Sequence, residues 1–235
     1  MSDLSFPPLM SGHAVSASED PFDTACVKAT MGCDAGLIVY RLEADHMAAA
    51  LVFAPEVPLA QAMAMLPTCG VGFQNALGAL APPEVAVHLE WGGAIRVNGA
   101  RCGRLRAMAS TLDPEQTPDW LVAGFELDLL PQDDDPGITP DRTALYAEGC
   151  ADVPAPLLLE AWARHTFNWI ARWESEGAKP LHAEWRGLVH ALGEETQQGS
   201  LCGTFLGTDD QFGMLLRDPD TTHLIPLSAR LETSS

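Results

Sequence analysis

The dipeptide Asn98-Gly99 constrains the fold of this chain more than any other short segment. It lies between two apolar runs: residues 85–91, which alternate and resume at 95–97, and residues 103–109. Asparagine followed by glycine favours the positive φ angles of a two-residue hairpin turn. The sequence therefore predicts an antiparallel hairpin with one buried face, and a fold built around a sheet.

Apolar periodicity predicts the other elements that precede residue 186. Asp20 is expected to cap a helix that begins at Pro21 and stops at Gly32, and Asp152 to cap a longer helix that ends at Gly177. The remaining predictions are an extended arm over 1–18, strands over 37–40, 47–53 and 120–130, helical segments over 58–65 and 70–80, a long helix over 156–174 and an acidic turn over 133–137.

The composition changes towards the C-terminus. Residues 201–206, 212–217 and 222–227 are short strand-like pieces separated by turn residues. The order of elements predicts an α+β fold, with a mixed sheet packed by helices over residues 1–185 and a small β-barrel over 186–235.

Charge excludes several classes of partner. Thirteen Lys and Arg against 32 Asp and Glu give a formal charge of −19, which argues against nucleic acid and against an anionic membrane surface. No apolar run approaches the roughly 20 residues of a membrane span. Lys28 and Lys179 are the only lysines, so any chemistry that needs a lysine must use one of them.

The cysteines and histidines indicate no metal or redox centre. The six cysteines are scattered, without a Cys-x-x-Cys pair, and the seven histidines lack metal-ligand spacing, so no metal is expected. Residues 1–18 carry no positive charge and no long apolar stretch, unlike a secretory signal. We therefore expect reduced thiols and a cytoplasmic protein.

Four stretches resemble motifs of one family. Residues 89–99 are similar to a Leu-Lys-Trp-Pro-Asn-Asp-Ile hairpin, 99–105 to a Lys-x-x-Gly-x-Leu strand and 121–128 to a Val-x-Gly-Ile-Gly-x-Asn strand, while 167–177 with 203–216 resemble a last helix followed by a small barrel. This order resembles the biotin protein ligases of the biotin/lipoate ligase superfamily. The resemblance implies a catalytic domain of the class II aminoacyl-tRNA synthetase and biotin ligase type, an SH3-like barrel, and homodimers paired through sheet edges.

Enzymes of that family activate a carboxylic acid with ATP and pass the acyl group to a protein lysine, and the sequence departs from the family at three elements of this chemistry. The link 42–46 replaces a Gly-Arg-Gly-Arg-x-Gly-Arg loop, and it holds two acids and neither glycine nor arginine. Ala100 stands where the hairpin lysine is expected, with Arg104 four residues on along the same face. Trp91 is kept, but residues 92–94 replace Pro-Asn-Asp and its carboxylate.

The resemblance also assigns candidate site residues. The catalytic candidates are Arg101, Arg104 and Cys102, the arginines as substitutes for the lysine and the thiol as a nucleophile. The ligand-binding candidates are Trp91, Gly92, Gly93, Gly103, Gly124 and Asp128. Each has a structural alternative: a core tryptophan, glycines of a strand bulge, a structural aspartate, a solvated arginine face that also includes Arg96 and Arg106, and a buried thiol.

Two functions remain open from the sequence. The first is a ligase-like protein that has lost ATP-dependent acid activation and binds a small carboxylic acid, its acyl derivative, or an acyl-carrier-type protein. The second is a divergent acyltransferase that takes a pre-activated acyl donor and uses Arg101 or Arg104 in place of the lysine. Biotin, lipoate or another acyl carboxylate are the expected ligands, and ATP is not expected under the first function.

Overall fold

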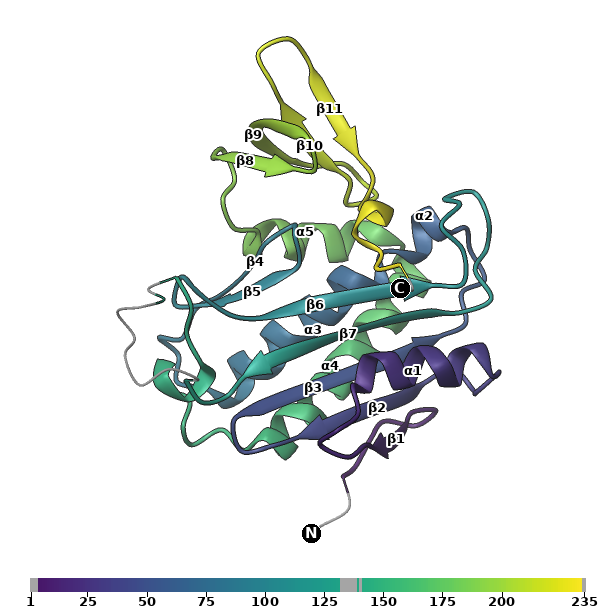
Figure 1. Ribbon diagram of the computed structural model, residues 1–235, viewed down its shortest axis with the longest axis vertical. Coiled ribbons are helices and arrows are strands. Elements are labelled where there is room, and N and C mark those ends of the chain that lie inside the picture. Colours follow the sequence, from purple (N-terminus) through teal and green to yellow (C-terminus); the bar gives the residue numbers. More distant parts are fainter. Residues whose placement is uncertain (1–3, 132–138, 140, 234–235) are drawn as a thin grey trace.

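Seven strands form one mixed sheet in the order β1-β2-β3-β7-β6-β5-β4 (Figure 1). The computed structural model describes residues 4–131, 139 and 141–233. Strands β1 and β2 pair in parallel, and the other neighbours pair antiparallel. The strands are β1 (Ser11–Ala14), β2 (Leu37–Leu42), β3 (His46–Phe53), β4 (Val87–Leu89), β5 (Ala94–Val97), β6 (Ala100–Ala109) and β7 (Leu121–Asp128).

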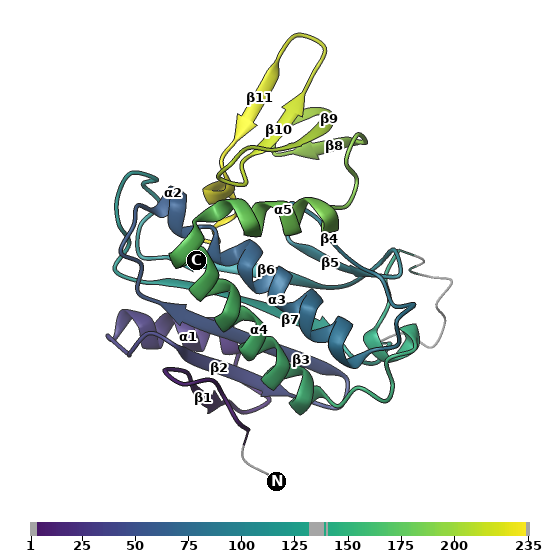
Figure 2. The same ribbon diagram turned by 180° about the vertical axis from the view of Figure 1, so that it is seen from behind.

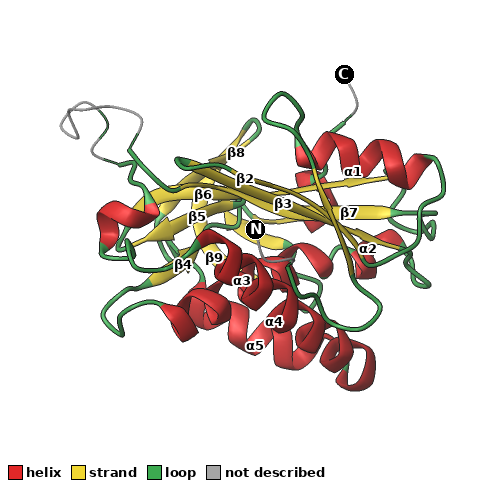
Figure 3. Cartoon of the chain, turned by 90° about the horizontal axis from the view of Figure 1, so that it is seen from below, coloured by secondary structure: helices red, strands yellow, loops and turns green. Residues whose placement is uncertain are grey.

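Helices cover the two faces of this sheet unequally, as Figures 2 and 3 show. Helix α1 lies alone on one face, and the longer α3, α4 and α5 pack on the other. None of the helices in the described part of the chain is long and apolar enough to cross a membrane. The helices are α1 (Pro21–Thr30), α2 (Leu59–Ala62), α3 (Met65–Leu80), α4 (Ala155–Glu176) and α5 (Ala178–Leu188), with short 3-10 turns η1 (Leu145–Glu148) and η2 (Leu227–Arg230).

Strand β3 is buried because helices cover both of its faces. Its central residues, 47–52, are all buried. Met47, Ala49 and Leu51 face α3 and α4, whereas Ala50 and Val52 face α1. A strand covered on both faces must be apolar throughout, which explains the continuous run in the sequence.

Two local signals of the sequence are confirmed, the Asn98-Gly99 turn and the Asp20 cap. Asn98 and Gly99 have φ angles of 50° and 92°, and Val97 pairs with Ala100 across the turn. The Asp20 side chain accepts hydrogen bonds from the backbone N–H groups of Phe22 and Asp23 and so caps α1.

A smaller antiparallel sheet follows α5 in the order β11-β10-β9-β8 (Figure 1). Its outer strands have no partner in the described part of the chain other than β10 and β9, so these strands form an open sheet, and closure into an SH3-like barrel stays a prediction. The strands are β8 (Glu195–Gln198), β9 (Leu201–Thr208), β10 (Met214–Arg217) and β11 (Thr222–Ile225).

Several predicted elements were wrong or incomplete. Asp152 does not cap α4, because the helix begins at Ala155 and Pro154 occupies the cap position without a side-chain hydrogen bond. The predicted strand over 85–91 contracts to Val87–Leu89. Helix α5 and strands β1 and β8 were not predicted. The acidic turn over 133–137 lies outside the described residues, which leave out 132–138.

Candidate functional site

The structure distributes the predicted site residues over separate places. Trp91, Gly92 and Gly93 lie in the turn between β4 and β5, next to the C-terminal sheet. Arg104 and Gly124 lie on the α1 side of β6 and β7, where Arg104 is opposite Glu126 and Gly124 is opposite Arg106. Cys102 and Asp128 lie close together near the opposite ends of β6 and β7. Within the described part of the chain, neither of the two best-defined pockets contains all of these residues.

Trp91 joins the two sheets. The residue is 3% exposed, and its indole N–H donates a hydrogen bond of 2.7 Å to the backbone carbonyl of Phe212. Arg230 Nη2 donates at 2.6 Å to the carbonyl of the neighbouring Gly92. Gly93 has a φ of 99°, a conformation that favours glycine. These contacts describe a structural junction, and a ligand role for the three residues stays a prediction.

The glycines of β6 and β7 allow close approach of neighbouring strands. A Cβ atom on Gly103 would lie 2.2 Å from the carbonyl oxygen of Glu126, and one on Gly124 would lie 2.1 Å from that of Ala49. Because real side-chain atoms do not approach backbone so closely, packing alone requires glycine at both positions.

Arg106 is the centre of an ionic cluster between β6, the start of α1 and the C-terminal segment. Its Nη1 donates to Asp20 at 2.7 Å, and its Nε and Nη2 donate to Glu232 at 3.0 and 2.9 Å. Asp23 and Glu126 are within 3.5 and 3.9 Å of the guanidinium. Several carboxylates therefore surround one cation whose side chain is only 11% exposed.

The α1 helix covers this cluster. The guanidinium carbon of Arg106 lies 4.2 Å from the centroid of the Phe22 ring, a cation–π contact. Burial alone would raise the pKa of Asp20, but its hydrogen bond to Arg106, the Arg106 charge and the backbone N–H groups of the cap outweigh burial. The pKa of Asp20 therefore lies below its ordinary value, so the carboxylate stays ionised and paired.

The other three arginines of the region are also paired. Arg104 pairs with Glu126, and Arg101 donates Nε and Nη2 to the two oxygens of Glu90 at 3.1 and 3.2 Å. Arg96 also pairs with Glu90. Burial would raise the pKa of Glu90, but these two arginines lower it below its ordinary value.

Cys102 is fully buried, and its Sγ lies 3.5 Å from the carbonyl oxygen of Asp128. Burial and then the Asp128 charge raise the pKa of the thiol above its ordinary value. A thiol in this state is a poor nucleophile, because the thiolate is the reactive form. In the described part of the chain no three histidine, cysteine or acidic side chains are close enough to hold a metal ion.

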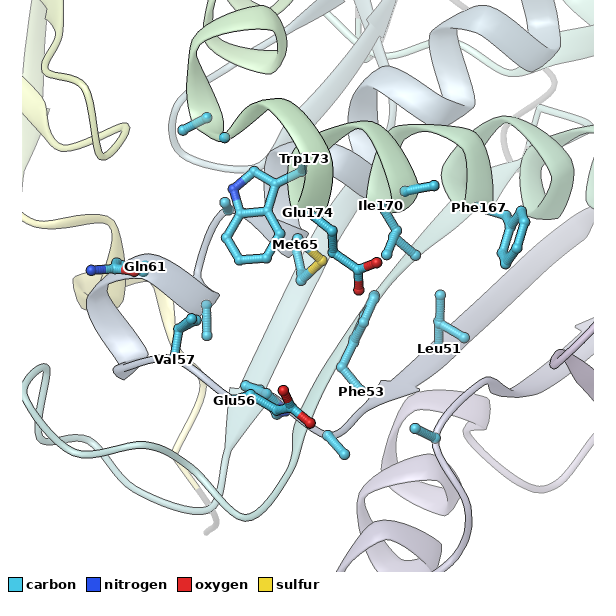
Figure 4. A pocket seen from close by; sticks show the side chains of 18 of the residues that line it. Leu51, Phe53, Glu56, Val57, Gln61, Met65, Phe167, Ile170, Trp173 and Glu174 are labelled. Carbon is cyan, nitrogen blue, oxygen red and sulfur yellow. The ribbon is translucent and has the colours of Figure 1, made fainter.

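A cavity of about 1020 Å³ lies on the side of the sheet that α3 and α4 cover. This cavity was not predicted from the sequence. It is bounded by the C-terminal half of α4, the end of β3, α2 and the turn between β9 and β10 (Figure 4). Its walls come from segments far apart in the sequence, so no local motif could have indicated it. The apolar lining includes Leu51, Phe53, Met65, Phe167, Ile170 and Trp173.

The fold is that of the biotin protein ligases. The apo biotin protein ligase of Aquifex aeolicus superposes with a TM-score of 0.72 over 94% of this chain and 96% of its own, at 14% identity. That of Leishmania major in complex with biotin gives a TM-score of 0.59 over 93% of this chain and 98% of its own, also at 14% identity.

The chain belongs to the biotin/lipoate A/B protein ligase family, whose model matches residues 6–187. A second model, described only as a domain of unknown function (DUF4444), matches residues 192–233. The crystal structure of a biotin protein ligase-like protein of unknown function from Silicibacter sp. TM1040 is 64% identical, with a TM-score of 0.93 over 98% of this chain and 100% of that one. Comparison with curated proteins gives no match.

Proposed function

We propose that this chain keeps the ligase fold as a binding scaffold and does not activate carboxylic acids with ATP. One observation carries the proposal: the partly buried guanidinium of Arg106 is already bound by Asp20 and Glu232. Acid activation gathers the anionic oxygens of nucleotide and acid at one point, so it needs free cations and N–H donors there. On this face the cation is committed and carboxylates surround it.

The link between β2 and β3 supports the same proposal. Residues 43–45 form a short hairpin turn, closed by a 2.8 Å hydrogen bond from the Glu43 N–H to the His46 carbonyl. Glu43 also pairs with Arg41, which draws that arginine into the local network. This tight acidic turn stands where the family resemblance implies a phosphate-binding loop. It supplies no glycine-rich cradle for anionic oxygens, so the chain's own residues do not fit ATP here.

The alternative acyltransferase receives little support. Arg101 would have to leave Glu90, and Arg104 would have to leave Glu126, before either could bind a substrate carboxylate. Cys102 would have to become exposed and lose its proton to form an acyl adduct. An activated octanoyl donor should therefore leave no acyl group on Cys102, and Cys102→Ala should not change any transfer that is observed.

The division at residue 186 remains part of this proposal. The two family matches end and begin at 187 and 192, and each region has its own sheet. A small ligand or a carrier-type protein remains the proposed partner, since the family is described as one of protein ligases. Biotin and ATP, which are bound in another structure of the Aquifex aeolicus biotin protein ligase, are the first ligands to test.

Isothermal titration calorimetry tests the proposal. ATP, biotin, lipoate and octanoate are titrated singly, and each acid is then titrated with ATP present. We expect no saturable heat from ATP and no enhancement of acid binding by ATP. Saturable ATP binding, strengthened by one acid and lost in Arg104→Met, would overturn the proposal. Arg172→Met, on the exposed face of α4, is a control that removes a positive charge elsewhere.

A further inference from the structure

The cavity combines an apolar floor with acidic walls. Phe53 and Met65 come from β3 and α3, and Ile170 and Trp173 come from α4. Figure 4 shows these side chains directed into one space, with Trp173 at the α4 wall. Cavities of about 300–1000 Å³ are typical of small-molecule sites. The volume of about 1020 Å³ is slightly above that range, so the cavity has room for a small molecule.

The charged lining residues all have the same sign. They are Glu56, Glu174 and Asp210, and the lining contains no lysine, arginine or histidine. In Figure 4 the carboxylates of Glu174, on α4, and Glu56, on the link after β3, project from opposite walls into the same space. Within the described part of the chain, none of the three carboxylates has an ion pair or hydrogen-bond partner. A positive charge here must therefore come from a ligand.

The negative charge of the cavity disfavours an anionic ligand and a second copy of the chain as occupants. A carboxylate such as octanoate would face these unpaired acids and the field of a chain with a formal charge of −19. A second copy of the chain would bring the same net charge. An ammonium group gains from the carboxylates and from the faces of the Trp173 and Phe53 rings. Its apolar body would cover the floor.

We propose that this cavity binds a small organic cation, a protonated amine joined to an apolar body such as an aryl-alkyl chain. The cavity lies on the α3–α4 side of the sheet, and Arg106 lies on the α1 side. The proposal thus goes beyond the proposed loss of acid activation and does not depend on it. Acid activation is measured with ATP, and amine binding is measured without it, so either proposal can fail alone.

The test uses three probes of the same shape: 4-phenylbutylamine, 4-phenylbutanol and 4-phenylbutanoate. Calorimetry on the full chain should show one site for the amine, with an affinity about tenfold above that of the alcohol, and no binding of the acid. Added salt should weaken binding of the amine and leave binding of the alcohol unchanged.

Variants show whether the binding takes place in the cavity. In a Glu56→Gln, Glu174→Gln double variant the affinity for the amine should fall about tenfold, to that for the alcohol. Glu176→Gln removes an acid of the same helix that pairs with Arg172 and does not line the cavity, so it should leave amine binding unchanged. Both glutamates of the double variant are exposed, so the fold should be kept.

Three results would overturn the proposal. The first is equal or tighter binding of 4-phenylbutanoate. The second is amine binding that falls equally in Glu176→Gln, which would indicate attraction to the acidic surface as a whole. The third is absence of amine binding in a folded protein. This result counts against the proposal also if sedimentation experiments show that the protein self-associates and thereby covers the cavity.

Discussion

Arg106 and Glu232 form a two-pronged ion pair across 126 positions of sequence, with Nε–Oε1 and Nη2–Oε2 distances of 3.0 and 2.9 Å. The Glu232 N–H also donates to the carbonyl of Ala107 at 2.8 Å. The C-terminal segment therefore closes over the α1 side of the sheet and pairs with the cation there.

Removal of this cation should destabilise the protein. Arg106→Met leaves Asp20 and Glu232 without their partner in a partly buried site, and we expect a loss of about 2 kcal/mol in the free energy of unfolding. Arg104→Met is the matched control, because the Arg104 side chain is 57% exposed and its pair should contribute less than about 1 kcal/mol. Urea denaturation measures both. Equal losses would contradict the central place of Arg106.

The stability of the folded protein should decrease at acidic pH. The folded pKa values of Asp20 and Glu90 lie below their ordinary values, so these groups bind fewer protons in the folded state than in the unfolded state. Their stabilisation is present above the unfolded pKa of about 4 and is lost as pH falls through the folded pKa. Melting temperatures measured from pH 6 to pH 2 should show this decline. Arg106→Met should flatten it, and an unchanged slope would contradict the assignment of Asp20.

Trp91 should matter for stability through its N–H group. Trp91→Phe leaves the buried carbonyl of Phe212 without its donor, which should cost about 1–2 kcal/mol. Trp169→Phe is the comparison, because the Trp169 indole donates to the half-buried side chain of Asn75, which can turn towards water. A Trp91→Phe protein as stable as wild type, with altered ligand binding, would favour the ligand role instead.

The packing of α3 against α4 should depend on Gly72. A Cβ atom there would lie 2.2 Å from Thr166 Oγ1 and 3.1 Å from its backbone, so Gly72→Ala should force the helices apart and cost about 1–3 kcal/mol. Gly78→Ala, on the same helix but exposed, should stabilise by up to about 1 kcal/mol through helix propensity. Calorimetric unfolding of the two variants should give opposite signs. Stabilisation by both would contradict the close packing.

Local signals in the sequence predicted the parts of the fold that local forces determine. The Asn98-Gly99 turn and the Asp20 cap depend on neighbouring residues only, and both were predicted correctly. Strands β1 and β8 are largely exposed edge strands without apolar alternation, and so gave no signal. Helix α5 buries only Leu181 and Trp185, so its apolar pattern is weak. Gly177 correctly indicated the end of α4 but gave no sign that a second helix starts directly after it.

From the sequence, the candidate site could be predicted only as a group of positively charged side chains on one strand. The arginines of β6 were recognisable, but their partners come from distant segments, such as Glu232 for Arg106 and Glu126 for Arg104. Whether a cation is free or neutralised is therefore a tertiary property. The cavity is likewise invisible in sequence, because its walls join α2, α4 and a turn of the C-terminal sheet.

Acid-dependent exchange of labelled pyrophosphate into ATP tests the loss of acid activation most directly, because it reports adenylate formation without any acceptor protein. With biotin, lipoate or octanoate we predict no exchange above the rate with ATP alone, while an active biotin protein ligase exchanges with biotin under the same conditions. Exchange that depends on one of these acids and is abolished by Arg104→Met would show that a surface-paired arginine supplies the missing charge, and would contradict the account.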